Sequence, residues 1–258
     1  MTVLLRATDI GKSFAGVEAL SDVSISVDEG QRVGLIGPNG AGKTTFFNCL
    51  FGMIEPDRGE ILLSGRDLSG LAPHRRARLG LGRTFQRMEL FSDMTVLEHL
   101  LVAERVRGHR GGLWQDLTGR GRPRRSEVDP CEEVLELLGL GELATVPIET
   151  LSLGQGRLVE VGRALMADPR LLLLDEPSSG LDQLETRMLA DTLRAVQRER
   201  GFAILLVEHD VELVASFTEQ AVVLDFGRMI ASGPTRDVLA DPDVRLAYLG
   251  DVDHLETS

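Results

Sequence analysis

The chain has 258 residues, with 28 Lys and Arg against 40 Asp and Glu, so its formal net charge is −12. Hydrophobic residues make up 43% of the chain and charged residues 26%, which excludes an intrinsically disordered protein, and the acidic balance argues against a general nucleic-acid binder. No apolar run approaches the roughly 18 residues of a membrane span, and the first residues contain no signal-peptide apolar region, so we expect a cytoplasmic protein.

Apolar patterns in the first part of the chain predict strands and one early helix. The expected strands cover residues 3–10, 20–27, 32–37 and 60–63. The expected helix covers residues 43–51, and from about 66 to 110 the pattern is mostly helical.

The second half of the chain alternates helices with apolar strands. The expected helices cover 132–140, 154–167, 181–200 and 211–217. The expected strands cover 171–174 and 203–207, followed by a hairpin of 221–224 with 228–231. The strand at 171–174 has no polar residue, as in a parallel sheet that is covered on both faces. This order of elements predicts an α/β fold with a mainly parallel sheet.

A glycine-rich segment lies between a predicted strand and a predicted helix and reads Gly37-Pro38-Asn39-Gly40-Ala41-Gly42-Lys43-Thr44. It fits the P-loop pattern G-x-x-x-x-G-K-[ST], in which glycines let backbone N–H groups turn toward phosphate oxygens. The positive N-terminal end of the helix points at the same anion. Lys43 would supply charge to the β- and γ-phosphates, and the Thr44 hydroxyl is placed to bind Mg²⁺. These residues predict a nucleotide site.

Two carboxylates follow the apolar strand at 171–174. Phosphoryl transfer needs a metal held opposite the P-loop and a group that orients the attacking water. Asp175, at the strand end, suits the Mg²⁺ shell, and Glu176 suits the water. The C-terminal ends of parallel strands are also where α/β sheets bind their ligands.

Further segments resemble the motifs of ABC-type ATPases. The segment 151–157 resembles the signature motif, which usually reads L-S-G-G-Q, although Leu153 stands where that motif has glycine. The segment 177–182 is similar to the D-loop of the family. Gln86 matches the Q-loop glutamine, and His209 matches the switch histidine.

Phe14 stands where the family places an adenine-stacking aromatic residue. The motifs occur in the family's order, and the resemblance covers nearly the whole chain. It implies a P-loop NTPase (RecA-like) core with N-terminal antiparallel strands. It also implies one ABC ATPase domain over 1–258, with a helical subdomain inserted at about 87–158 and an acidic helical tail at 234–258.

The resemblance also implies roles for individual residues in this chain. Glu176, His209 and Gln86 would act in catalysis. Mg²⁺ would be held by Thr44, Gln86 and Asp175. ATP would be bound by Phe14, Gly37, Pro38, Asn39, Gly40, Ala41, Gly42, Lys43, Thr44, Thr45, Ser152, Gly154, Gln155 and Asp182. The signature residues would bind the γ-phosphate of ATP on a second copy, so that two chains enclose two ATP molecules.

Three regions resemble the branched-chain amino acid and amide importer subfamily: the segments 83–103, 208–210 and 233–250. This implies partners: a second ABC ATPase chain, identical or related, integral membrane permease subunits, and indirectly an extracytoplasmic substrate-binding protein. It also implies a peripheral location on the cytoplasmic face of the membrane. The sequence leaves two alternatives open, an exporter motor for lipid or lipopolysaccharide and a soluble ABC ATPase without a transport role.

Two features stand outside these motifs. The segment 104–125 carries seven arginines and two acids, and it is either a solvated loop between two helices or a contact surface for an acidic partner or lipid headgroups. Cys49 and Cys131 belong to no close Cys/His pair, so we expect packing thiols and neither a zinc site nor a disulfide.

Overall fold

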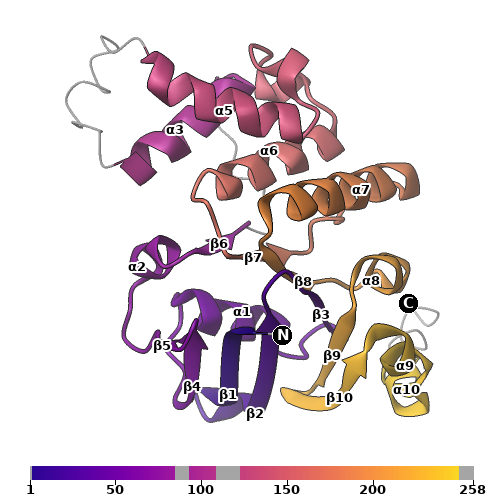
Figure 1. Cartoon of the computed structure of the whole chain (residues 1–258). Helices are drawn as coiled ribbons and strands as arrows, with labels where there is room; N and C mark the ends of the chain where they lie inside the picture. Colours follow the sequence, from indigo (N-terminus) through magenta and orange to yellow (C-terminus); the bar gives the residue numbers. More distant parts are fainter. Residues whose placement is uncertain (1, 85–92, 109–122, 250–258) are drawn as a thin grey trace.

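The computed structural model describes residues 2–84, 93–108 and 123–249. Its elements form two sheets in the lower part of Figure 1 and a group of helices above them. Among the described residues, no helix is both long enough and apolar enough to cross a membrane.

The first sheet is antiparallel and has the order β2-β1-β4-β5. Its strands are β1 (Val3–Phe14), β2 (Val17–Asp28), β4 (Arg58–Leu63) and β5 (Arg66–Asp67). The second half of β2 alternates buried residues with more exposed ones, as in a sheet with one face on the core, whereas register shifts in β1 place buried residues such as Leu4 and Leu5 next to each other.

The second sheet has six strands in the order β10-β9-β3-β8-β7-β6. The strands that pair in parallel are β9 (Gln220–Asp225), β3 (Arg32–Ile36), β8 (Ala203–Val207), β7 (Leu171–Asp175) and β6 (Leu81–Arg83). Among its described strands, β10 (Arg228–Pro234) alone pairs in the antiparallel direction, as the hairpin partner of β9. The predicted α/β fold with a mainly parallel sheet and N-terminal antiparallel strands is confirmed.

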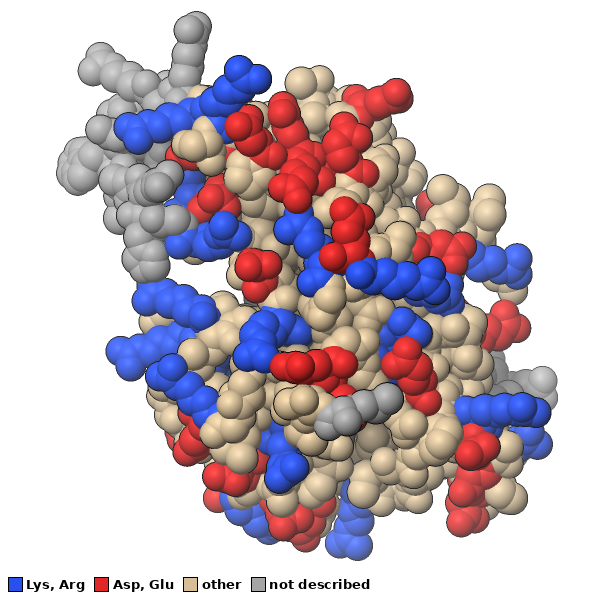
Figure 2. Space-filling model, in the orientation of Figure 1, with Lys and Arg blue, Asp and Glu red and all other residues tan. Residues whose placement is uncertain are grey.

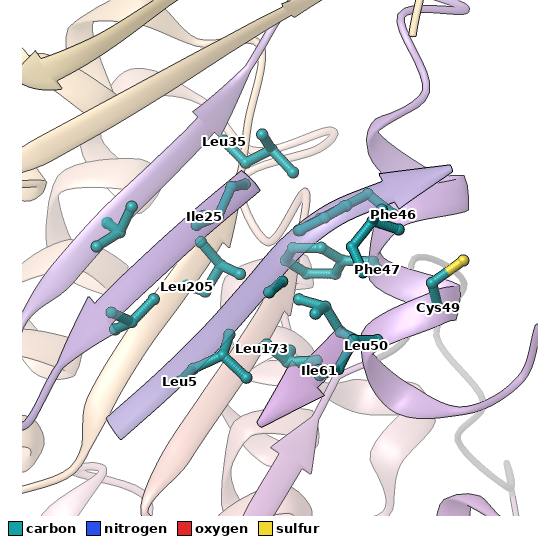
Figure 3. Packing of buried hydrophobic residues seen from close by; sticks show 14 of the residues in the cluster. Leu5, Ile25, Leu35, Phe46, Phe47, Cys49, Leu50, Ile61, Leu173 and Leu205 are labelled. Carbon is teal, nitrogen blue, oxygen red and sulfur yellow. The ribbon is translucent and has the colours of Figure 1, made fainter. Parts of the chain in front are cut away.

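Helices cover both faces of the parallel sheet. One core holds the antiparallel sheet, helix α1 (Lys43–Phe51) and one side of the parallel strands, including Leu171 and Leu173. Figure 3 shows side chains of α1, Phe46, Phe47 and Leu50, in this core. A second core contains Leu172 and Leu174 from the other side of β7. The strand at 171–174 therefore lacks alternation because both of its faces are buried.

The second core is built largely from helices. These are α3 (Val96–Gly108), α5 (Arg125–Leu137), α6 (Leu153–Leu165), α7 (Gln183–Arg200) and α8 (Val211–Phe217). Figure 1 shows α3, α5 and α6 gathered apart from the antiparallel sheet. The limits of the helical subdomain, expected at 87–158, stay a prediction. Short 3-10 turns at Gly141–Leu143 and Ile148–Thr150 connect α5 to α6.

A small third core lies beneath the C-terminal helices α9 (Thr235–Ala240) and α10 (Pro242–Leu249). Val238 and Val244 from these helices pack with Ile36, Val214 and Val223. The described part of the tail is therefore helical, and α9 packs against β9.

Two sequence expectations about the elements need correction. The sequence predicts a mostly helical stretch from 66 to 110; its described residues contain the helices α2 (Pro73–Arg78) and α3, but also the strands β5 and β6, which this prediction misses. The helix expected at 132–140 begins earlier, at Arg125, and ends at Leu137, with Pro130 inside it. Of the arginine-rich segment 104–125, residues 109–122 lie outside the described residues.

Candidate functional site

The register of the parallel sheet brings three motifs to one edge. Leu35 of β3 pairs with Val207 of β8, and Val207 pairs with Asp175 of β7. The residues that follow these three positions therefore leave the sheet at the same height and on neighbouring strands. They are the P-loop after β3, Glu176 after β7, and Glu208 and His209 after β8.

The P-loop runs from β3 into α1 and needs glycine at its two ends. Gly37 has φ of +151°, and a Cβ there would lie 2.1 Å from the Leu224 carbonyl oxygen. Gly42 has φ of +99°, and its Cβ would lie 2.7 Å from the Ala19 carbonyl oxygen. Both positions combine a left-handed backbone with close neighbouring backbone, so a side chain is excluded.

Lys43 and Thr44 open α1 at the end of this loop. Lys43 is only 6% exposed, and its ammonium group donates hydrogen bonds to the carbonyls of Gly37 and Pro38, the second at 3.0 Å. Thr44 is exposed, and α1 has neither an acidic residue in its first turn nor a side-chain cap. The positive end of α1 thus lies beside a lysine charge, which is an arrangement suited to phosphate.

Asp175 ends β7 and is nearly buried, at 2% exposure. Its Oδ2 accepts a hydrogen bond of 2.8 Å from Nη2 of Arg83, the last residue of β6, whose Nη1 donates to Asn48 of α1 at 2.7 Å. Its Oδ1 is buried and has no hydrogen-bond partner among the residues that the structure describes. Burial raises the pKa of this carboxyl, while Arg83 acts in the opposite direction.

An unpartnered buried oxygen is costly, and such groups mark sites where a ligand completes the bonding. Asp175 with the Thr44 hydroxyl is a sparse set of oxygen donors, of the kind with which proteins bind Mg²⁺ together with substrate phosphates. The residues present therefore fit this ion.

Glu176 follows Asp175 in an unusual backbone conformation. Its φ is +48°, which non-glycine residues rarely adopt and which is concentrated at functional sites. Its N–H donates to the Val207 carbonyl at 2.9 Å, so the turn is anchored to β8. The side chain is partly exposed beside the P-loop edge of the sheet.

His209 and Glu208 leave β8 beside this turn. The side chain of His209 is 59% exposed, and its Nδ1 lies 3.8 Å from Oε2 of Glu208. Glu208 is fully buried, and its Oε1 accepts a 2.9 Å hydrogen bond from the N–H of Ser178. Burial raises the pKa of the Glu208 carboxyl, against the lowering effect of its bonds to Ser178.

The signature and D-loop residues lie at the starts of two helices. Ser152 caps α6, where its hydroxyl accepts from the N–H of Gln155 at 3.3 Å, and Asp182 caps α7 in the same way through the N–H of Glu185 at 2.8 Å. Gly154 is buried in the first turn of α6. Figure 1 shows α6 apart from α1, so within one chain the structure does not bring the signature residues to the P-loop.

Two predicted site residues remain, Phe14 and Gln86, and the structure describes only the first. Phe14 ends β1 with 44% of its surface exposed, and the Lys12 ammonium lies 5.6 Å from the centre of its ring. Gln86, expected both in catalysis and at the metal, lies outside the described residues.

Sequence reasoning assigned no role to Arg83 or Glu208. Each lies in a segment that resembles the importer subfamily: Arg83 stands three residues before Gln86, and Glu208 stands directly before His209. Only the fold brings them to their partners.

A groove of about 410 Å³ lies beside β6, between α2 and the helices α3 and α6. Its apolar lining includes Val102 and Val106, which are exposed, and Phe51 and Ala164. Arginines also line it, namely Arg78, Arg83, Arg107 and Arg163. Figure 2 shows Lys and Arg side chains gathered on this side of the molecule, where Figure 1 has α2 and α3.

Comparisons with known proteins agree with this geometry. The family model described as ABC transporter matches residues 20–179, and the model described as branched-chain amino acid ATP-binding cassette transporter matches residues 228–254. The high-affinity branched-chain amino acid transport ATP-binding protein BraF of Pseudomonas aeruginosa is 40% identical over 255 residues, covering 96% of this chain and 98% of BraF. The lipopolysaccharide export system ATP-binding protein LptB of Acidithiobacillus ferridurans is 37% identical, covering 97% of this chain and 98% of LptB.

A solved structure is similar over the same length. The crystal structure of the ADP conformation of an ATP-binding cassette of an ABC transporter superposes with a TM-score of 0.87 at 33% identity, covering 97% of this chain and all of that one. The predicted P-loop NTPase core is confirmed by this likeness. The chain belongs to the ABC transporter family, as an ATP-binding subunit that hydrolyses ATP.

Proposed function

We propose that this chain powers an importer of branched-chain amino acids or related amino acids and amides. It would lie on the cytoplasmic face of the membrane, with permease subunits and a second ATPase chain, and a substrate-binding protein would deliver the cargo. The observation that carries the cargo class is the match of residues 228–254 to the branched-chain amino acid cassette family. The similarity to BraF over nearly the whole of both chains supports it.

The P-loop edge of the sheet would hold the nucleotide. Backbone N–H groups of residues 39–45, at the end of the P-loop and the start of α1, would bind the phosphates, and Lys43 would exchange its bonds to loop carbonyls for phosphate oxygens. Phe14 would stack on the adenine ring. Thr44 and Asp175, with Gln86, would hold Mg²⁺, which supplies charge stabilisation to the transferring phosphoryl group when it is bound.

Two side chains would act on the γ-phosphate. Glu176 follows β7 in a strained turn, at the edge of the sheet from which the P-loop leaves, and its carboxylate would orient the attacking water and accept its proton. His209, exposed at the end of the neighbouring strand, would donate a hydrogen bond to the γ-phosphate.

The signature residues would serve a second chain. Ser152, Gly154, Gln155 and the helix start behind them would bind the γ-phosphate held by that chain, and Asp182 would contact it nearby. ATP would then favour the closed pair because only ATP has a γ-phosphate to bridge both surfaces, and hydrolysis would reopen it.

The groove beside β6 would receive the permease. Its lining is largely apolar, includes four arginines and one acidic residue, Glu160, and reaches Thr84, the residue at which the described chain leaves β6 toward Gln86. A short helical segment of a cytoplasmic permease loop, apolar on one side and acidic on the other, fits this lining. Binding of the permease in the groove would therefore act on the segment that follows Thr84 and carries Gln86.

Uptake by cells tests the cargo class. Deleting the gene should abolish high-affinity uptake of radiolabelled leucine, isoleucine or valine while leaving arginine uptake and surface lipopolysaccharide unchanged, and restoring the gene should recover uptake. Unchanged uptake of all three amino acids together with a lipopolysaccharide defect would contradict the importer and favour an exporter motor, the alternative to which the similarity with LptB corresponds.

Glu176→Gln tests the catalytic assignment with the purified full chain. It should retain ATP binding, lose hydrolysis by at least about a hundredfold, and accumulate as an ATP-bound pair in size-exclusion chromatography. Normal turnover in this variant would remove Glu176 from the mechanism. Lys43→Ala is the companion variant and should lose hydrolysis through loss of phosphate binding.

A further inference from the structure

Glu208 is a buried carboxylate that the mechanism above does not use. It directly follows β8, and its side chain is completely shielded from solvent. Burying a carboxylate is expensive unless hydrogen bonds satisfy it. The bonds that Glu208 makes therefore indicate what it is for.

The two oxygens of Glu208 accept hydrogen bonds from two different loops. Oε1 accepts from the N–H of Ser178 at 2.9 Å, and Oε2 accepts from the N–H of His209 at 3.2 Å. Oε2 also lies 3.8 Å from Nδ1 of the His209 ring. One side chain thus joins the loop after β7 to the histidine after β8.

The loop after β7 carries Glu176, two residues before Ser178. A turn connects them, since the N–H of Ser179 donates to the Glu176 carbonyl at 3.1 Å. From α6, Nη2 of Arg157 donates to the Ser179 carbonyl at 3.2 Å. The position of Glu176 is therefore tied through Ser178 to Glu208.

Only a carboxylate satisfies both contacts. Both partners are N–H donors, so two acceptor oxygens are needed. Glutamine has the same shape, but it offers one oxygen and turns an NH₂ group toward the second donor. Glu208→Gln therefore breaks one of the two links with almost no change in volume.

We propose that Glu208 is a positioning residue that holds the Glu176 loop and His209 in fixed relation around the γ-phosphate. The inference rests on the roles proposed above for Glu176 and His209. It predicts a loss in the chemical step and little loss in nucleotide binding, because Glu208 itself reaches no substrate.

Steady-state ATP hydrolysis by the full chain tests this. Glu208→Gln should lower kcat on the order of tenfold to a hundredfold and leave KM for MgATP within about twofold. Glu219→Gln is the matched control, because Glu219 also accepts a backbone N–H, that of Arg32 at 3.0 Å, but at the opposite end of the sheet. The control should keep the kcat of the unaltered chain.

Combination with His209→Ala adds a readout that a general structural effect would not give. If Glu208 acts through His209, the double variant should lose less than the product of the two single losses. A product of independent losses, or a kcat within twofold of normal in Glu208→Gln, would overturn the proposal. If Glu208→Gln does not fold, Glu208→Asp replaces it, because aspartate keeps both oxygens on a shorter side chain that cannot reach both loops as before. The same kcat and KM ranges then decide for or against the proposal.

The failure of this inference is distinct from failure of the proposed function. Normal turnover in Glu208→Gln alongside inactive Glu176→Gln would remove Glu208 alone. Normal turnover in Glu176→Gln would remove the catalytic assignment itself.

Discussion

Two buried carboxylates stand at the ends of neighbouring strands, and they differ in how completely they are bonded. Glu208, after β8, uses both oxygens on backbone N–H groups. Asp175, at the end of β7, bonds Arg83 through one oxygen, and its other oxygen is buried without a hydrogen-bond partner in the described part of the chain. A satisfied buried carboxylate organises its surroundings, whereas a half-satisfied one has bonding capacity kept for a ligand.

The source of the bonds differs as well. Glu208 accepts bonds from the backbone N–H groups of Ser178 and His209, which substitutions of neighbouring side chains leave in place, and the Ser178 hydroxyl adds to this support. Asp175 is held by the side chain of Arg83, which also contacts Asn48 of α1 and lines the groove beside β6. Asp175 is thus connected to the proposed permease groove, and Glu208 to the catalytic loops.

The largest expected effect is that of Asp175→Asn on hydrolysis. Loss of a metal-binding oxygen should lower kcat by about a thousandfold, since metal-held charge stabilisation is worth several kcal/mol. Electron paramagnetic resonance of Mn²⁺ in the presence of ATP should show weaker binding than in the unaltered chain. Asp191→Asn, an exposed carboxylate on α7, is the control and should bind Mn²⁺ normally. Normal Mn²⁺ binding by Asp175→Asn would show that the free oxygen is not reserved for metal.

Next in size is the effect of Arg83→Met on stability. It removes the cation that is hydrogen-bonded to the buried Asp175 carboxylate and leaves only the more weakly acting charge of Lys43, which costs on the order of 3–5 kcal/mol. Urea unfolding at neutral pH should show this loss, and adding Asp175→Asn should recover part of it. Arg125→Met, at a largely exposed pair with Asp129, should not change the free energy of unfolding measurably. If the loss in free energy of unfolding of the double variant equals the sum of the losses of the two single variants, the two residues do not act as a pair.

The sequence predicts the parts of this site that depend on local pattern. The glycine spacing at 37–44 predicts the cradle, because its geometry is set within eight consecutive residues. The apolar run at 171–174 predicts a strand buried on both faces, and the two cores confirm it.

What sequence cannot supply is a contact between distant segments. Arg83 and Asp175 are 92 residues apart, and Glu208 and Ser178 are 30 apart. Strand β6 has only three residues, too few for an alternating pattern, so the element that carries Arg83 was also missed. Without β6 in the sheet, nothing indicates that Arg83 faces a carboxylate.

The pH dependence of stability should also reflect the incomplete bonding of Asp175. Its pKa is raised in the folded chain above the ordinary 3.8, so its contribution to stability is greatest below 3.8 and is lost as pH rises through the raised pKa. The free energy of unfolding of Asp175→Asn minus that of the unaltered chain should therefore increase from about pH 4 upward and then level off. Urea unfolding across this range measures it, and a difference that is constant with pH would contradict the raised pKa.

The smallest expected effect is that of Ser178→Ala, and it separates backbone from side-chain support of Glu208. The 2.9 Å bond to Oε1 comes from the backbone N–H, which alanine retains. The hydroxyl also holds the pKa of Glu208 down, so its loss should cost about 1 kcal/mol or less in urea unfolding. Turnover should stay within about twofold of normal, because the link from Glu208 to the Glu176 loop remains. A loss of kcat as large as that of Glu208→Gln would mean that the hydroxyl maintains the link, and the contrast between a backbone-held and a side-chain-held carboxylate would then fail.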